Sequence, residues 1–297
     1  MSDEPGRRIA SPVWLVLGSI VSVQAGAALA KNVFGLVDPT ALVWLRLTTA
    51  AIVVAVLVRP TLRGRTGRDW LVVAGYATTL IGMNWAIYQA MARIPLGVAV
   101  TIEFLGPLAI AVLGSRRVRD LVWVALAAGG VVLLGLGGSG VHAVGTIGGL
   151  DPVGVGFAVV AAACWGAYIL LGARTGQRWS GLSGLAVALV IGAVVLAPPA
   201  LAVGGTDLLN PYVIGIGVLV GLLSSVIPYS LELVALRRIR SSTFGILMSV
   251  EPAAAALAAV VVLQEWLTPW QVVAMALVIA ASVGAARSAG RKDVVRD

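Results

Sequence analysis

Charged side chains are scarce in this sequence. Asp, Glu, Lys and Arg make up 11% of its 297 residues, whereas a soluble globular domain carries about 25%. The mean hydropathy is +1.00, and no polar stretch between about residues 12 and 288 is long enough to fold by itself. The composition excludes a soluble protein and predicts one membrane domain over 1–297.

Cysteine and histidine are almost absent, with one residue of each, Cys164 and His142. A single cysteine excludes an internal disulfide, and these two side chains cannot form a metal-ligand cluster or the nucleophile and base of an enzyme. The Gly-rich stretch at 135–140 lacks the Lys and Ser or Thr of a phosphate-binding loop. We therefore expect no enzyme, no ATP hydrolysis, no metal and no cofactor.

Long apolar runs are what the sequence has instead. A helix needs about 20 mostly apolar residues to cross ~30 Å of hydrocarbon, and the frequent Gly and Ala of these runs suit close helix packing in lipid. The alternating ~10-residue segments of a β-barrel do not occur. The sequence predicts an all-α integral membrane protein with ten transmembrane helices, at 13–37, 39–58, 70–91, 95–115, 121–138, 152–172, 181–203, 212–235, 241–262 and 269–288.

The basic residues follow the predicted topology. The formal net charge is +8, and nearly all of the 21 Lys and Arg residues lie in the terminal segments and in every second loop. Because cytoplasmic loops are enriched in Lys and Arg, we expect both termini in the cytoplasm. The positive charge is thus explained by topology, and no nucleic-acid partner is expected.

A weak internal repeat relates the two halves of the chain. A shift of 145 residues places the third and fourth segments over the eighth and ninth. The coinciding residues include Arg93 and Arg238, Ile94 and Ile239, and Pro107 and Pro252. Five spans per half is an odd number, so the repeats predicted at 12–140 and 151–288 are inverted, as in many secondary transporters whose site lies at mid-membrane on interrupted helices.

Two acidic residues lie deep in apolar segments, each with a proline nearby. Glu103 begins the sequence EFLGP, and Glu251 directly precedes Pro252. A proline within a helix cannot donate to the carbonyl four residues back, so Pro107 and Pro252 are predicted helix breaks. Insertion of an acidic residue at this depth in the membrane costs about 2.5–3.5 kcal/mol of free energy. We therefore expect both acids to face the protein interior or a water-filled cavity. Burial also raises the pKa of a carboxyl group, so proton exchange is one function; the alternative is a protonated group that serves packing.

Other polar and aromatic side chains occupy neighbouring apolar segments. Asn84 and Tyr88 share one helix face, as do Tyr229 and Glu232, and Pro228 is a third predicted helix break. Interhelical hydrogen bonding is the alternative role for Asn84 and Gln24, and packing is the alternative for Trp165. The candidates for substrate or proton binding are Glu103, Glu251, Asn84, Gln24, Tyr88, Trp165, Tyr168 and Tyr229.

Three further charges are candidates for gating or charge pairs. Lys31 lies in the outer third of the first segment, where its stem can reach the interface. Arg46 lies deeper in the second segment, where its side chain can also reach the interface or can pair with a carboxylate. Glu232 lies near the cytoplasmic end, where a gate or an ion pair with Arg237 is expected. Lys31 or Arg46 could also attract a substrate carboxylate.

Several stretches resemble a known family. They are SVQAGAALAK at 22–31, GMNWAIYQA at 82–90, PLGVAVTIEFLGPLAIAVLGSRRVRDLVWV at 95–124, ACWGAYIL at 163–170 and PYSLELVALRRIRSSTFGILMSVEPAAAAL at 228–257. The chain resembles the EamA type of the drug/metabolite transporter superfamily, and within it the threonine/homoserine exporter (RhtA-like) group. Gln264-Glu265 departs from the Gly-Glu that this family often has before its last helix.

The resemblance implies two inverted five-helix halves and an inner-membrane exporter of small polar metabolites, with threonine and homoserine as first candidates. It implies proton antiport with alternating access rather than ATP as the driving force, and it carries over Glu103, Glu251, Asn84 and Gln24 as site residues. The expected partners are the substrate, protons and the lipid bilayer. Alternatives are export of another amino acid, a nucleobase-like metabolite or a cationic drug, and the oligomeric state is open.

Overall fold

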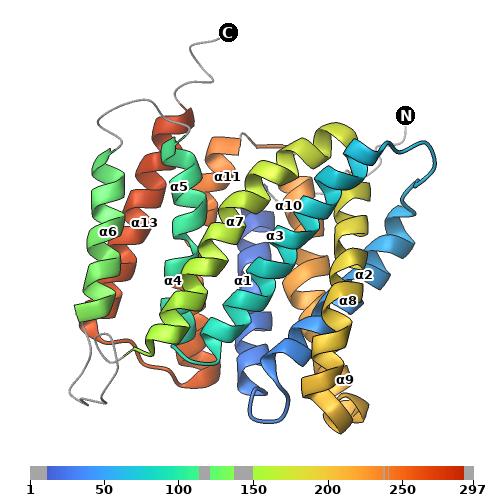
Figure 1. Cartoon of the computed structure of the whole chain (residues 1–297). Coiled ribbons are helices and arrows are strands. Elements are labelled where there is room, and N and C mark those ends of the chain that lie inside the picture. The colour runs from blue at the N-terminus through green and yellow to red at the C-terminus, as the bar shows by residue number, and fades with distance from the viewer. Residues whose placement is uncertain (1–11, 114–120, 137–149, 237, 240, 291–297) are drawn as a thin grey trace, which may run out of the picture.

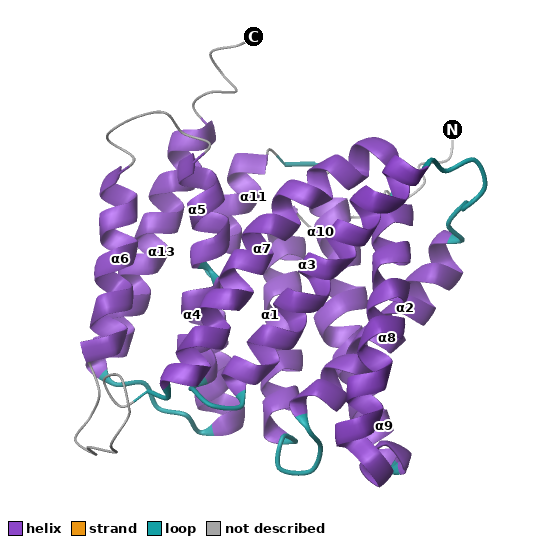
Figure 2. Cartoon of the chain, viewed as in Figure 1, coloured by secondary structure: helices purple, strands orange, loops and turns teal. Residues whose placement is uncertain are grey.

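A computed structural model describes residues 12–113, 121–136, 150–236, 238–239 and 241–290, and within these ranges every regular element is helical (Figures 1 and 2). His142 and Arg237 lie outside the described residues. The elements are α1 (Pro12–Asn32), α2 (Pro39–Val58), α3 (Gly67–Met91), α4 (Leu96–Glu103), α5 (Leu105–Leu113), α6 (Leu121–Leu136), α7 (Pro152–Arg178), α8 (Ser183–Gly204), the 3-10 helix η2 (Gly205–Leu209), α9 (Pro211–Gly221), the π-helix η3 (Leu222–Val226), α10 (Ile227–Leu236), α11 (Ser241–Met248), α12 (Glu251–Ala258), the π-helix η4 (Ala259–Leu263) and α13 (Pro269–Gly290).

The helices match the ten predicted spans. In the described ranges, nine helical stretches are long and apolar enough to cross a membrane, and Leu121–Leu133 is a shorter apolar helix. The predicted end of the first span at residue 37 is wrong, because α1 ends at Asn32 and a turn follows. The chain is therefore an all-α, multi-pass membrane protein.

Three helices begin with the same local signal. Asp38, Asp151 and Asn210 each precede a proline, and each accepts a hydrogen bond at its side-chain oxygen from the backbone N–H two residues on, at 2.7, 2.8 and 2.9 Å. Such a cap satisfies an N–H that the helix leaves free, and proline at the first helical position needs no donor. The helices that start this way, α2, α7 and α9, all begin at the lower side of Figure 1.

The packing partners of the helices follow an inverted repeat. Helix α2 packs on α8, α4 on α12, and α6 on α13, so three helices of the first half each contact their counterpart in the second half. The contact of α3 with α7 is repeated by that of α10 with α1. This is the arrangement of two inverted five-helix repeats. The exact repeat bounds, 12–140 and 151–288, stay a prediction, and residues 137–149, which include the end of the first repeat, lie outside the described residues.

Two spans are interrupted shortly before a proline, and a third changes its helix type there. The fourth breaks at Phe104, between α4 and α5, three residues before Pro107. The ninth breaks at residues 249–250, just before Pro252. The eighth widens into the π-helix η3, which runs directly into α10, so the predicted break at Pro228 is wrong and the proline is accommodated by the wider turn. Each proline removes a backbone donor and crowds the preceding turn. Pro198 and Pro199 were not singled out in the sequence, and α8 continues through both.

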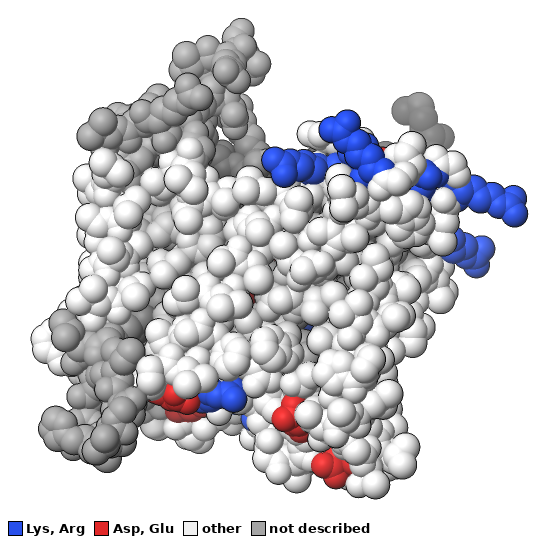
Figure 3. All heavy atoms as spheres, viewed as in Figure 1, with Lys and Arg blue, Asp and Glu red and all other residues white. Residues whose placement is uncertain are grey.

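Basic side chains are concentrated at one end of the bundle. In Figure 3, Lys and Arg gather along the upper edge, over the connection between α2 and α3 and the end of α7, while acidic side chains lie at the lower end. The corresponding segments, 59–68 and 174–178, hold Arg59, Arg63, Arg65, Arg68, Arg174 and Arg178. The first described helix begins, and the last one ends, at this basic end (Figure 1).

Candidate functional site

A cavity of about 200 Å³, lined by both polar and apolar side chains, lies inside the bundle. Helices α1, α2, α3, α4, α7, α10, α11 and α12 and the π-helix η3 all contribute to its wall. The cavity brings together all eight side chains that the sequence singled out for substrate or proton binding, together with Arg46 and Glu232. Its lining includes Gln24, Arg46, Asn84, Tyr88, Glu103, Trp165, Tyr168, Tyr229, Glu232 and Glu251.

The two helix breaks position the two acids at this cavity. Glu103 is the last residue of α4 and Glu251 is the first residue of α12, and they are 9% and 7% exposed. Since α4 packs against α12, one acid from each half of the fold faces the same space. The arrangement can hold a cation or a proton between the halves.

One hydrogen bond joins the halves at the cavity wall. Gln24 on α1 donates from Nε2 to Oε1 of Glu251 at 3.1 Å. Within the described residues, Oε2 of Glu251, Oε1 of Gln24 and the hydroxyl of Tyr88 have no partner. Buried polar atoms are nearly always hydrogen-bonded in folded proteins, so these atoms are available to a bound molecule. Asn84 differs, because its amide donates to the carbonyl of Leu80 on its own helix at 2.8 Å.

Arg46 points into the protein and not toward a membrane interface, so it does not reach the interface as the sequence allowed. Its side chain is buried, with Nε donating to Ser225 Oγ at 3.2 Å and Nη2 donating to the Ser224 carbonyl at 2.9 Å. The guanidinium carbon lies 5.6 Å from the centre of the Tyr88 ring. The π-helix η3 thus supplies both hydrogen-bond acceptors.

Lys31 is the one charged candidate that lies away from the cavity. Its ammonium forms an ion pair with Glu265 at 2.6 Å and donates to the Ile94 carbonyl at 2.7 Å. Glu265 also accepts from the backbone N–H of Leu96 at 2.9 Å. These contacts join the end of α1, the turn between α3 and α4, and the segment before α13. Lys31 therefore ties together three segments at one end of the bundle.

A second cavity of about 200 Å³ lies toward the basic end. Tyr168, Tyr229 and Glu232 line both cavities, so these three side chains form the partition between them. Tyr168 stacks on Tyr76 with ring centres 4.8 Å apart. Glu232 accepts a hydrogen bond from the Ser19 hydroxyl, and its expected partner Arg237 lies outside the described residues.

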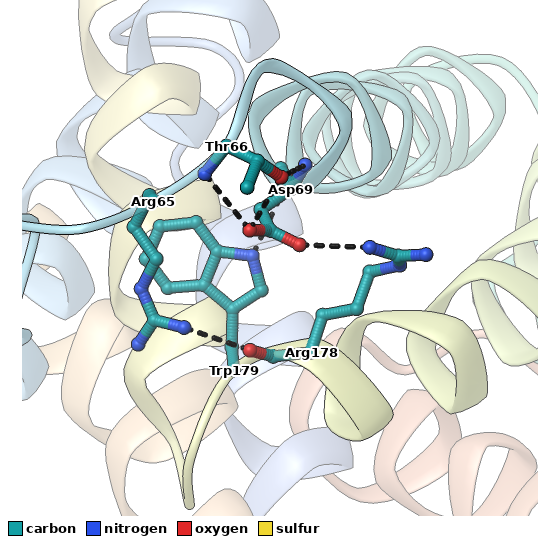
Figure 4. Close-up of polar contacts among 5 residues, drawn as sticks. All are labelled: Arg65, Thr66, Asp69, Arg178 and Trp179. Atoms are coloured by element: carbon teal, nitrogen blue, oxygen red, sulfur yellow. Dashed lines mark hydrogen bonds and ion pairs between the residues drawn. The ribbon is translucent and has the colours of Figure 1, made fainter.

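A polar cluster borders the second cavity at the basic end (Figure 4). Thr66 and Asp69 form a capping box at the start of α3, and Asp69 pairs with Arg178 at 2.9 Å. Trp179, 1% exposed, packs under the guanidinium of Arg65 at 4.3 Å and donates from its indole to the Asp69 carbonyl. The cluster joins the start of α3 to the end of α7.

Sequence reasoning missed some of these residues. Ser224, Met83 and Met248 also line the central cavity. The cluster of Asp69 with Arg178 was also missed, although Thr66 and Asp69 stand three residues apart before an apolar run, which is the signature of a capping box. A methionine in an apolar segment carries no signal that separates a cavity wall from packing.

Polar residues from both halves of an inverted-repeat helix bundle line one central cavity. This arrangement is that of a membrane transporter. The chain belongs to the EamA-like transporter family, whose sequence pattern matches residues 152–287. It is 38% identical to the threonine/homoserine exporter RhtA of Escherichia coli (strain K12), over 99% of this chain and 98% of that protein. It is 37% identical to the threonine/homoserine exporter RhtA of Salmonella typhimurium (strain LT2), over 98% of both chains.

A solved structure shares the fold. A crystal structure that is 20% identical in sequence superimposes with a TM-score of 0.62, covering 94% of this chain and 98% of the other. At this identity the likeness concerns the arrangement of the helices alone.

Proposed function

We propose that this protein exports small amino acids, with threonine and homoserine as the first candidates, in exchange for protons. The similarity to two exporters of these compounds over nearly the full chain supports the substrate class. The observation that carries the proposal is the cavity lined by Glu103 and Glu251, one buried acid from each half of the fold.

The two acids suit an exchange mechanism. A carboxylate at this cavity binds either the ammonium group of an amino acid or a proton, and the two compete for the same oxygen atoms. Release of the substrate on one side then frees the carboxylate for a proton from that side. Oε2 of Glu251, which has no partner among the described residues, is the atom that we assign to this exchange.

We propose that access alternates between the two ends of the bundle. The contacts of Lys31 with Glu265 and Ile94 support a gate at the acidic end, because they tie three segments together. The second cavity and its partition of Tyr168, Tyr229 and Glu232 support a path toward the basic end. The repeats at 12–140 and 151–288 are the bodies that would move against each other.

The orientation follows from the charge separation. We propose that the protein lies in the inner membrane with the basic end, and therefore both termini, in the cytoplasm, because short cytoplasmic loops are rich in Lys and Arg. The gate at Lys31 and Glu265 then lies on the outer side. The second cavity faces the cytoplasm, from which a substrate for export enters.

Transport by purified protein in liposomes tests the proposal. An imposed proton gradient is expected to drive labelled threonine or homoserine across the membrane, and uptake of protons is expected to accompany it. Glu103→Gln and Glu251→Gln keep the side-chain volume and remove the exchangeable proton, so both should abolish proton-driven movement. Asp207→Asn, at an exposed acid, is the matched control. Full proton-driven transport in both Gln variants would refute the mechanism.

A different substrate for the same fold is the second candidate. The aromatic side chains of Tyr88, Trp165, Tyr168 and Tyr229 in the cavity wall favour a planar compound such as a nucleobase-like metabolite, or an organic cation, since aromatic faces attract both. A panel of labelled amino acids, nucleobases and cationic drugs in the same liposomes separates these readings. Transport of a nucleobase without transport of any amino acid would replace the first proposal.

A further inference from the structure

Arg46 is a buried positive charge without a carboxylate partner in the part of the chain that the structure describes. The two ion pairs of that part join Lys31 to Glu265 and Arg178 to Asp69. Isolated buried charges are costly and are normally paired. A guanidinium that is kept in the cavity wall without an acid beside it is therefore suited to an anion that comes and goes.

The surroundings of Arg46 fix its direction without using up its donors. A guanidinium has five N–H groups, and two of them donate, from Nε to Ser225 and from Nη2 to Ser224. Three N–H groups remain, both of those on Nη1 among them. Both acceptors lie on η3, so the π-helix ahead of Pro228 forms the cradle. Tyr88 covers the guanidinium from another helix.

The opposite charge lies across the same cavity. Glu103 and Glu251 line the same cavity as Arg46, one acid from each half of the fold. A zwitterion with an ammonium group and a carboxylate on one carbon presents two opposite charges to these groups. A compound with the ammonium alone would leave the guanidinium unpaired.

We propose that Arg46 binds the α-carboxylate of the transported substrate and restricts transport to amino acids with a free carboxylate. The inference rests on the proposed function and names the group that selects the substrate class. Planar, paired recognition of a carboxylate is what a guanidinium offers and an ammonium does not. Threonine amide and the amino alcohol of threonine are therefore expected to be excluded, although both keep the ammonium and the side-chain hydroxyl.

Competition against labelled threonine by unlabelled compounds, with purified protein, tests this. In the unsubstituted protein, threonine and homoserine should compete about ten- to hundred-fold better than threonine amide or the amino alcohol, the ratio expected for one charged hydrogen-bonded contact. In Arg46→Met the affinity for threonine should fall by that factor, and the preference over the amide should disappear. Arg46→Lys should keep part of the preference. Arg63→Gln, at an exposed arginine between α2 and α3, is the control and should leave the preference intact.

The outcomes separate the two proposals. If Arg46→Met weakens threonine and its amide equally, or if Arg46→Lys and Arg46→Met keep the full preference, Arg46 only holds helices together and the inference is wrong. The comparison of threonine with its amide in the unsubstituted protein tests the requirement for a free carboxylate even if Arg46→Met misfolds, and Arg46→Lys then tests the residue. If the protein binds a different carboxylate compound with the same dependence on Arg46, the proposed substrate is wrong, but the proposed role of Arg46 in binding a carboxylate is supported. If no carboxylate compound of the panel binds, both fail.

Discussion

Gln24 and Glu251 meet across the two halves of the fold, where the amide nitrogen of Gln24 donates to Oε1 of Glu251 at 3.1 Å. The two side chains come from α1 and α12, which are more than 200 positions apart in the chain. The contact holds one oxygen of the acid in place and leaves the other, Oε2, unpartnered among the described residues. This geometry orients the carboxyl group of Glu251 and leaves Oε2 free to bind a proton or a substrate.

Loss of the Gln24 amide should impair transport strongly. In Gln24→Leu, Glu251 loses its donor, and a hydrogen bond to a charged group contributes about 1.5–3 kcal/mol, so substrate exchange should fall about ten- to hundred-fold. Thr101→Val is the matched control, because Thr101 is buried and donates to the Gly97 carbonyl of its own helix, away from the cavity lining, and its effect should stay within about threefold. Transport rates in liposomes measure both, and equal losses would contradict the specific role of Gln24.

Weakening of the ion pair between Lys31 and Glu265 should open the cavity to the outer side. Glu265→Gln removes the charge that holds Lys31 and weakens its acceptance from the Leu96 N–H. A cysteine at the cavity-lining position Ala27, with Cys164→Ala in the background, should then react several-fold faster with a membrane-impermeant maleimide added outside.

The polar cluster at the opposite end supplies the control for this experiment. Arg178→Gln removes an ion pair of similar exposure at the basic end and should leave labelling from the outer side unchanged. Unchanged labelling in Glu265→Gln would show that the Lys31 contacts do not limit access, and an equal rise in Arg178→Gln would point to general loosening of the bundle.

Trp179 should contribute to stability more than an exposed tryptophan does. It is 1% exposed, lies under Arg65, and meets the Trp70 ring edge-on at 5.6 Å between ring centres. Truncation of such a side chain costs about 3–5 kcal/mol, so Trp179→Ala should lower the unfolding temperature in detergent clearly. Trp266 is 76% exposed, and Trp266→Ala should have little effect. Similar unfolding temperatures for the two variants would contradict the packing described.

Gly106 should resist even the addition of a methyl group. It lies where α5 meets α7, and a Cβ atom there would collide with the carbonyl of Ala162. Overpacking of a close contact costs about 1–3 kcal/mol, so Gly106→Ala should lower the unfolding temperature and disturb the break beside Glu103. Gly129→Ala is the control, because a Cβ there meets nothing within 4 Å, and it should be neutral or stabilising. Equal behaviour of both variants would count against the close approach.

The prolines show how much of the site could be predicted from local chemistry. A proline removes a donor wherever it stands in a helix, so Pro107, Pro228 and Pro252 marked places where the helices could break. The same rule also applies to Pro198 and Pro199, which α8 includes without a break. The local rule names the sites of strain, and the packing around each proline decides whether the helix is interrupted.

The charged residues show the limit of that reasoning. Lys31, Arg46 and Glu232 were three charges of uncertain role in apolar segments, because a side chain that can reach an interface can equally turn inward. Their partners are far away in the chain: Glu265 for Lys31, Ser224 and Ser225 for Arg46, and Ser19 for Glu232. No local pattern encodes such distances.

The sequence by itself determined that this protein is an α-helical membrane protein, where its helices lie, and which polar groups are buried at a cost in free energy. These properties follow from hydropathy and backbone chemistry, which act over a few residues. The tertiary structure alone decided that Arg46 and the two acids share one cavity while Lys31 belongs to an ion pair elsewhere. That assignment depends on which helix faces pack together, and the packing is settled by contacts between residues far apart in the chain.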